Sequence, residues 1–378
     1  MQHRDYFRRT WLLALVIMIT LSCNLFSKPK TIDNEPVGKN TQPAATKITK
    51  PSTNKIQVDY LYTSNLITVI YPLYGTALDD FSIVTITNTL SSQIDVIVES
   101  EITGYTTKAI DTVEIGAGEV MEVRQNPRLI PEKLDELTVQ KPAQYLVKVT
   151  QLDNGEEKLL LEETGDTLVY AKRDFPWSIP GFTQSEVFDL LASMVTPNDP
   201  GVEELIRKAA NYIDAGIMWG GYGDHVDDDD GSVYARLEAI WAAEEQDYNL
   251  TYISTSLSFA PGYVQRIRLP GEVLEEHSGN CIETSLLYAS AAEALKLETG
   301  IILIPGHAFL AVRTDLANAN YFFIETTMIG RATFAEAINR GSEEWDETLP
   351  HLDAEEEDYG WVTVEDAWDK GISPLPWR

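Results

Sequence analysis

The chain has 378 residues, 44% of them hydrophobic, which is enough for two domains with substantial cores. Its formal net charge of −30 excludes a nucleic-acid-binding role, because so acidic a surface repels phosphates and offers no basic stripe. Two cysteines and five histidines are too few for a disulfide framework or a structural zinc site, so we predict no metal.

Residues 1–22 have the pattern of an export signal. Three arginines within the first nine residues precede an apolar run from Trp11 to Leu21, which is too short for a comfortable membrane span. The run ends in Thr20-Leu21-Ser22-Cys23, which resembles the lipobox of bacterial lipoproteins, although Thr20 stands where that motif usually has Leu, Val or Ile. We therefore predict lipidation at Cys23 and an exported protein anchored to the outer face of the cell membrane. An ordinary signal peptide and an uncleaved anchor are the alternatives.

Residues 23–55 are predicted to be a disordered tether. No aromatic residue occurs from Ser27 to Ser52, and four prolines lie among Lys, Thr and Asn. Such a spacer directly after a lipid-bearing cysteine would hold the folded part clear of the bilayer.

Residues 56–172 are rich in short β-type runs between segments that contain Gly, Asn, Asp and Pro. About seven strands are expected, among them Ile67–Tyr71, Leu159–Leu161 and Leu168–Tyr170, with no convincing helix. This pattern predicts an antiparallel, immunoglobulin-like (Ig-like) sandwich, with a role as a spacer or recognition module.

Helical periodicity replaces the β pattern after a predicted linker at residues 173–183, where two prolines flank Trp177. Apolar residues recur at helical spacing in the following segment, for example at Leu205, Ala209 and Tyr212. We predict an α+β domain over residues 184–340. The acidic C-terminal segment, residues 341–378, is expected to pack on that domain.

Cys281 is the only cysteine that remains once the export segment is set aside. Gly279 and Asn280 make a turn before it, and an apolar helical pattern follows from Ile282 to Leu297. A helix start favours a thiolate, because backbone N–H groups point at it. Cys281 is therefore either a nucleophile or a small buried hydrophobic residue.

Two further residues complete a nucleophile, base and orienting carboxylate in chain order. His307 is the first polar residue of a strand that follows Pro305-Gly306, and Glu325 ends the next apolar strand. These are the parts of a cysteine acyl-transfer triad. The alternatives are a structural histidine at a strand entry and a surface acid at a strand end.

The tetrahedral intermediate of acyl transfer also needs hydrogen-bond donors for its oxyanion. The backbone N–H of Cys281 is one by position, and the side-chain amide of Gln265 is our candidate for the second. Asn280 competes for this role. A surface position for Gln265 and a turn-forming role for Asn280 are the alternatives, and Arg266 and Arg268 are expected to pair with acids.

These segments together resemble the transglutaminase-like domain of the papain-like cysteine enzymes. The resemblance implies an α+β fold in which the cysteine helix packs on an antiparallel sheet that carries the histidine and the acid. The family's triad is Cys-His-Asp, so Glu325 departs from it. The resemblance covers roughly residues 185–340, and its motifs are Gln265–Leu274, Gly279–Cys281, Gly306–Phe309 and Ile324–Thr327.

Two functions are consistent with these observations. In the first, Cys281 attacks a carboxamide or peptide carbonyl of a protein or peptide substrate, His307 protonates the leaving group, and water or an amine resolves the thioester, with no cofactor. The second is a non-catalytic surface binding module that keeps the transglutaminase-like fold. Whether the enzyme would hydrolyse or cross-link is left open.

Overall fold

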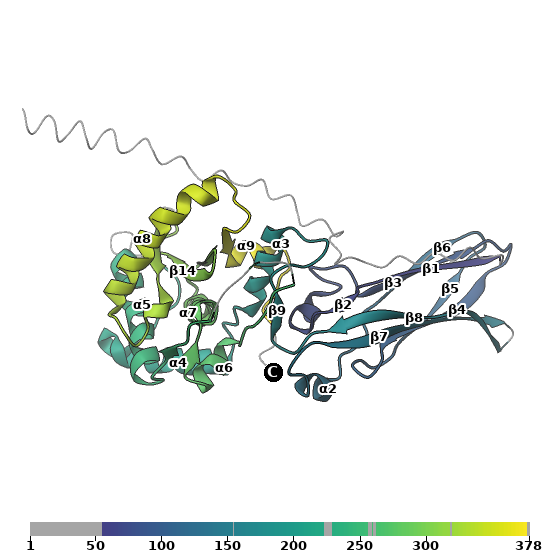
Figure 1. Cartoon of the computed structure of the whole chain (residues 1–378), viewed down its shortest axis with the longest axis horizontal. Coiled ribbons are helices and arrows are strands. Elements are labelled where there is room, and N and C mark those ends of the chain that lie inside the picture. Colours follow the sequence, from purple (N-terminus) through teal and green to yellow (C-terminus); the bar gives the residue numbers. More distant parts are fainter. Residues whose placement is uncertain are drawn as a thin grey trace, which may run out of the picture. The chain divides into compact units, whose positions relative to one another are not determined.

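The computed structural model describes residues 55–153, 155–222, 229–255, 259, 262–317 and 320–375 (Figure 1). The predicted signal peptide, Cys23 and nearly all of the predicted tether lie outside these residues. The chain from Lys39 to Arg378 forms one compact unit. Within the part that the structure describes, no helix is both long and apolar enough to cross a membrane.

The first part of the chain forms two β-sheets. One is antiparallel, in the order β1-β3-β6, and the other has the order β2-β8-β7-β4-β5, in which only the β2–β8 pair is parallel. Their bounds are β1 Ile56–Tyr62, β2 Asn65–Leu66, β3 Ser82–Asn88, β4 Ile94–Ile102, β5 Ala109–Ile115, β6 Val120–Gln125, β7 Lys141–Asp153 and β8 Glu156–Val169, with the short helices η1 Thr68–Leu73 and α2 Pro131–Asp135.

The two sheets share one core. Alternate residues of β4 are buried, and Tyr145 of β7 stacks on Tyr62 of β1 with ring centroids 4.6 Å apart. Gln125 of β6 donates its side-chain amide to the carbonyl of Val98 in β4, at 3.1 Å. A buried hydrogen bond thus joins the sheets across their apolar faces.

One strand prediction in this part was wrong. Ile67–Tyr71 is not a strand: Thr68–Tyr71 belong to η1, because Pro72 cannot donate a ladder hydrogen bond and the segment is buried. Leu159–Leu161 and Leu168–Tyr170 were expected as two strands, and all of these residues except Tyr170 lie in the single long strand β8.

The second part is built around a four-stranded antiparallel sheet in the order β15-β14-β13-β16, with the bounds β13 Thr299–Ile304, β14 His307–Arg313, β15 Tyr321–Ile324 and β16 Gly360–Thr363. Ile304 pairs with His307, so Pro305 and Gly306 alone make the turn between β13 and β14. Gly306 has φ +81°, which a Pro-Gly turn requires at its second central residue.

Helices surround this sheet (Figure 1). Helix α7, Cys281–Ala294, is buried on nearly all sides and packs on β14 and β13, while α8, Phe334–Asp353, packs on β15. The other elements of this part are β9 Asp174–Pro176, α3 Gln184–Asp189, η2 Leu190–Met194, α4 Pro200–Ala209, η3 Ala210–Tyr212, η4 Asp214–Gly216, α5 Asp229–Gln246, β10 Thr251–Tyr252, β11 Val264–Arg266, α6 Pro270–Glu275, β12 Ser278–Gly279, η5 Thr326–Met328 and α9 Val364–Asp369.

We expected a domain boundary after residue 340, but the structure has none at that position. Helix α8 runs straight across that position, and β16 pairs with β13 as an edge of the central sheet. Gly341 lies so close to β15 that an added Cβ would meet the carbonyl of Phe323. The C-terminal segment, which we expected to pack on that domain, therefore contributes a helix and a strand to it.

The segment that we expected to be a linker is also structured. Strand β9 pairs with β11, and Trp177 is fully buried against Phe175 and Phe259. Its backbone N–H donates to the carbonyl of Tyr263. The described residues thus form a mixed α and β protein with several sheets, in which an all-β part is followed by an α+β part.

Candidate active site

Cys281 is the first residue of α7, as the sequence predicted. Asn280 is the N-cap of the helix: its side-chain oxygen accepts from the N–H of Glu283 at 3.1 Å, and Glu283 accepts from the N–H of Asn280 at 3.0 Å. The free thiol of Cys281 is 1% exposed. The N–H of Cys281 belongs to the first turn, whose N–H groups have no helical carbonyl to bind.

Arg268, which precedes α7 in the chain, also holds the start of that helix in place. Its Nε and Nη2 donate to the two oxygens of Glu283, at 2.9 and 2.6 Å, and its backbone N–H donates to Glu283 as well. The hydrogen bond with Glu283 is the main reason that the pKa of Arg268 is raised. Arg268 thus pairs with acids, as expected, and orients the turn that carries Cys281.

His307 lies against a carboxylate. Its Nε2 is 2.6 Å from Oε2 of Glu325, and the Cys281 side chain is among the groups that raise its pKa. Burial lowers the pKa of His307, but the contacts with Cys281, Glu325 and Glu344 outweigh this and raise it well above its ordinary value.

Glu325 is held by both of its oxygens. Oε1 accepts from the N–H of Thr327 at 2.8 Å and from the hydroxyl of the same residue, while Oε2 faces His307. Burial raises the pKa of Glu325, but the hydrogen bonds from its partners, His307 foremost, lower it below its ordinary value. The structure therefore brings together the three residues of the predicted triad.

A fourth ionisable residue at this position was missed in the sequence. Glu344 of α8 is 8% exposed; its Oε2 is 3.6 Å from Nε2 of His307, and its Oε1 is 2.8 Å from Arg340. The helical spacing of the C-terminal acidic segment could have revealed it, because Glu344 falls on the same helix face as the apolar residues of α8. That face consists of Phe334, Ala337, Gly341, Glu344 and Thr348.

His307, Glu325 and Glu344 also form the one group with metal-ligand chemistry among the described residues, with donor atoms within 4.8 Å of one another. Two ligands on a tetrahedral zinc ion lie about 3.3 Å apart, given zinc–ligand distances near 2.0–2.1 Å. The separation of 2.6 Å between Nε2 of His307 and Oε2 of Glu325 is that of a hydrogen bond. The absence of a metal stays a prediction.

Gln265 is buried in β11, so the surface alternative for it was wrong. Its Oε1 accepts from Nε1 of Trp177 at 3.1 Å, which fixes the orientation of the amide. Its Nε2 is buried and has no hydrogen-bond partner among the described residues. A fixed donor left without a partner is the property that an oxyanion site requires. The side-chain oxygen of Asn280 is the N-cap of α7, which confirms its turn-forming role and leaves its amide N–H as the competing donor.

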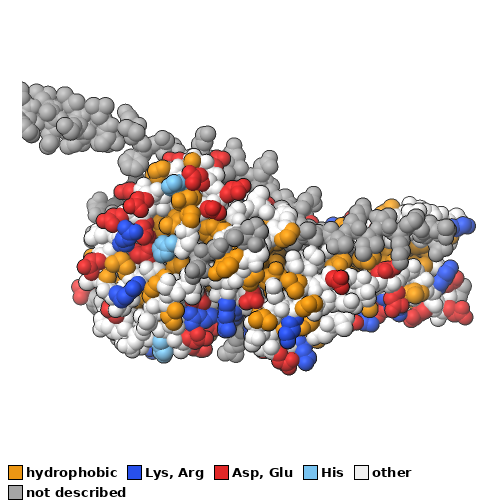
Figure 2. Space-filling view, in the orientation of Figure 1, with side chains coloured by type: hydrophobic (Ala, Val, Ile, Leu, Met, Phe, Trp, Pro, Cys, Tyr) orange, Lys and Arg blue, Asp and Glu red, His pale blue; other side chains and the backbone are white. Residues whose placement is uncertain are grey.

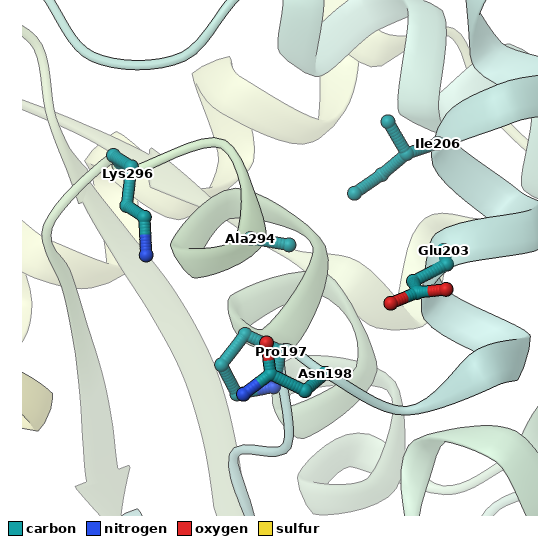
Figure 3. Close-up of a pocket in the computed structure, with 6 residues that line it drawn as sticks. All are labelled: Pro197, Asn198, Glu203, Ile206, Ala294 and Lys296. Atoms are coloured by element: carbon teal, nitrogen blue, oxygen red, sulfur yellow. The ribbon is translucent and has the colours of Figure 1, made fainter.

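A separate pocket lies far from these residues. It has a volume of about 290 Å³ and opens where α4 meets the C-terminal end of α7 (Figure 3). Cys281 begins α7 and Ala294 ends it, so the pocket is about 20 Å from the thiol. Its lining residues are Pro197, Asn198, Glu203, Ile206, Ala294 and Lys296.

Acidic side chains are spread over the face of the molecule seen in Figure 2, with fewer Lys and Arg among them. They do not gather into one patch on that face, and no basic stripe crosses it. This distribution agrees with the net charge of −30 and offers no track for phosphates.

No protein-family profile matches the chain, and no curated protein matches it. A protein from Archaeoglobus fulgidus is similar at 10% identity and a TM-score of 0.21, over 34% of this chain and 96% of that one. A FixG-related protein from Vibrio parahaemolyticus is similar at 11% identity and a TM-score of 0.21, over 32% and 99% of the two chains. Such low TM-scores establish no shared fold, so the interpretation of the site depends on its own geometry.

Proposed function

We propose that the protein is a cysteine acyl-transfer enzyme of transglutaminase-like type. Cys281 would be the nucleophile, His307 the general base and acid, and Glu325 the residue that orients the imidazole. The observation that carries this proposal is the position of His307, which lies 2.6 Å from Glu325 and whose pKa is raised in part by the Cys281 side chain.

The first half-reaction follows from these contacts. The thiolate of Cys281 attacks a carboxamide or peptide carbonyl, and the carbonyl oxygen becomes an oxyanion. The N–H of Cys281 and the free Nε2 of Gln265 are the proposed donors to that oxyanion. The imidazolium of His307 then gives its proton to the leaving ammonia or amine, and a thioester on Cys281 remains.

The second half-reaction reverses the proton transfer. His307, now neutral, takes a proton from water or from an amine as that nucleophile attacks the thioester. Water would give hydrolysis, and an amine would give transfer or cross-linking. Apart from the substrate and the water or amine, every step uses side chains and a backbone N–H of this protein, so the proposed reaction needs no cofactor.

The substrate is proposed to be a protein or peptide outside the cell. The predicted lipid anchor at Cys23 would hold the enzyme at the outer face of the membrane. Residues 56–172 would act as an Ig-like recognition or spacer module, an assignment supported by two sheets that share a core.

A non-catalytic surface binding module is the second candidate. The observation in its favour is the burial of the thiol, which is 1% exposed and must become accessible before it can react. In that case the β part would recognise the partner, and the charged cluster around His307 would have a structural role.

An activity screen separates the two candidates. The full chain is incubated with casein, peptidoglycan peptides and glutamine-donor peptides, and ammonia release, cleavage and cross-linking are followed. We expect activity on at least one substrate class and none from Cys281→Ala, with a thioester on Cys281 detected by mass spectrometry after acid quenching. Equal product formation by the wild type and Cys281→Ala would rule out the enzymatic proposal.

A further inference from the structure

Glu344 is a buried carboxyl group that the proposed reaction does not use. Its Oε1 is 2.8 Å from Nη2 of Arg340 on the same helix, but no donor among the described residues reaches its Oε2. The nearest nitrogen to that oxygen is Nε2 of His307, at 3.6 Å, beyond ordinary hydrogen-bond length. A buried carboxylate oxygen without a donor is costly, whereas a protonated carboxyl can itself donate.

Glu325 is the acceptor available to that proton. One oxygen of Glu344 and one of Glu325 lie within 4.8 Å of each other and of a ring nitrogen of His307. Two buried carboxylates at this separation repel each other strongly, so a pair of this kind retains one proton. Glu325 already accepts from His307 and Thr327, which favours the charge on Glu325 and the proton on Glu344.

The charged surroundings support the same distribution. His307 faces the pair from β14, and Cys281 of α7 is among the groups that raise the pKa of that imidazole. Among the described residues, Arg340, on α8 itself, is the other cation that pairs with Glu344; its side chain is 44% exposed and it also pairs with Glu343. Burial raises the pKa of Glu344, and the neighbouring Glu325 raises it further although His307 lowers it.

We propose that Glu344 is a positioning residue that carries the proton of a Glu344–Glu325 carboxyl pair. This inference rests on the proposed function, because the pair acts through His307. In the resting enzyme the imidazolium would face a single negative charge shared by the pair. As the pH rises, Glu344 ionises and adds a second negative charge beside His307, which holds the imidazolium in its charged form to higher pH.

The test uses the full chain and the variants Glu344→Gln and Glu343→Gln. Glutamine has the shape of a protonated glutamate, and Glu343 is a matched control one residue away on α8, with a side chain 68% exposed. Infrared difference spectra against the wild type report the loss of a protonated carboxyl group. The ratio of Cys281 alkylation rates with iodoacetate and iodoacetamide reports the charge on His307, because only the anionic reagent is attracted by an imidazolium.

We expect Glu344→Gln to remove one protonated-carboxyl band at neutral pH, and Glu343→Gln to leave that band in place. The pH at which the reagent ratio falls should decrease by about one unit in Glu344→Gln only, which corresponds to about 1.4 kcal/mol. An unchanged band or an unchanged pH limit in Glu344→Gln would overturn the proposal. So would failure of this variant to fold, which would mean that the negative charge of Glu344 is required.

A failure of the proposed function can be distinguished from a failure of the proposal for Glu344. If the wild-type thiol of Cys281 is inert toward both reagents at every pH, the triad is not reactive, and the positioning role of Glu344 falls with it. The infrared band then still decides whether Glu344 carries a proton.

Discussion

Glu325 reaches His307 although its side chain is one methylene longer than the aspartate of the family that the sequence resembles. The structure accommodates this length by holding the second oxygen on Thr327 in the following turn. A carboxylate held at both ends has one orientation toward the imidazole, and this favours one tautomer and one ring position.

Glu325→Gln should lower the free energy of unfolding by about 1–3 kcal/mol near neutral pH, because it leaves a buried donor without its charged acceptor. Glu325 has a lowered pKa, so its contribution is present above the ordinary value of 4.5 and is lost as the pH falls through the lowered value. His307 has a raised pKa, so its contribution is present below 6.5 and is lost as the pH rises through the raised value.

The penalty should therefore be largest between about pH 4.5 and pH 6.5 and shrink in stronger acid. Urea unfolding of both proteins at a series of pH values measures it. A loss of the same size at every pH would show that the two groups are not linked.

Substitutions can show whether Gln265 or Asn280 is the side-chain donor to the oxyanion. Gln265→Leu should lower kcat by about 10²–10³-fold with little change in the alkylation of Cys281, because the donor acts only on the intermediate. Asn280→Asp keeps the N-cap but has no amide donor, and it should retain most of the turnover. Both are compared on whichever substrate the screen identifies; a larger loss in Asn280→Asp than in Gln265→Leu would reverse the assignment.

The order Cys281, His307 and Glu325 could be predicted because each residue sits at the end of a helix or strand whose pattern is clear in the sequence. Glu344 could not be found in this way. Its position depends on α8 crossing β15, which brings an acid from a charged run of the sequence against His307.

At the scale of elements, the start of α7 is fixed by a buried ion pair. Arg268→Gln leaves Glu283, which is almost fully buried, without its partner and should destabilise the protein by about 3–5 kcal/mol. Thermal unfolding measures this loss. Arg266→Gln is the matched control, since Arg266 is an exposed arginine two residues earlier, and it should change the stability little. Equal effects of the two variants would mean that the ion pair does not hold the helix start.

A helix or strand could be predicted where one hydrophobic period, that of a helix or that of a strand, dominates its segment of the sequence. The apolar run from Ile282 to Leu297 predicted α7, which ends three residues earlier, at Ala294, and Pro305-Gly306 marked the turn before β14. The predictions failed where tertiary packing overrides the local sequence pattern. A β-rich segment that contains Pro72 forms the helix η1 instead of a strand. An acidic segment that we expected to begin after residue 340 is a continuation of α8.

At the scale of the whole molecule, β9 connects the segment that follows the β part to a strand of the proposed site. It pairs with β11, which carries Gln265, and its Phe175 is fully buried. A fragment that begins at Trp177 should therefore melt at a lower temperature than one that begins at Arg173. Both lack the β part, so the difference measures the contribution of β9 together with Arg173, which pairs with Glu272. Circular dichroism melts of the two fragments measure it, and identical melting temperatures would show that β9 is dispensable.

The lipid anchor and the Ig-like character of the β part stay predictions. Cys23 lies outside the described residues, and the two-sheet arrangement alone does not define a family. The continuous hydrophobic core, which includes Tyr145 of the β part and Leu286 of α7, nevertheless agrees with one compact unit from Lys39 to Arg378.

The reactivity of Cys281 in the presence and absence of His307 tests the central claim most directly. Iodoacetamide labelling of the full chain is followed by mass spectrometry of the Cys281 peptide, from mildly acidic to neutral pH. We predict that labelling stays fast at mildly acidic pH and falls at least tenfold in His307→Ala, while circular dichroism shows an intact fold. A thiol that is labelled only after denaturation, with no change in His307→Ala, would contradict the catalytic account and leave the binding module as the better one.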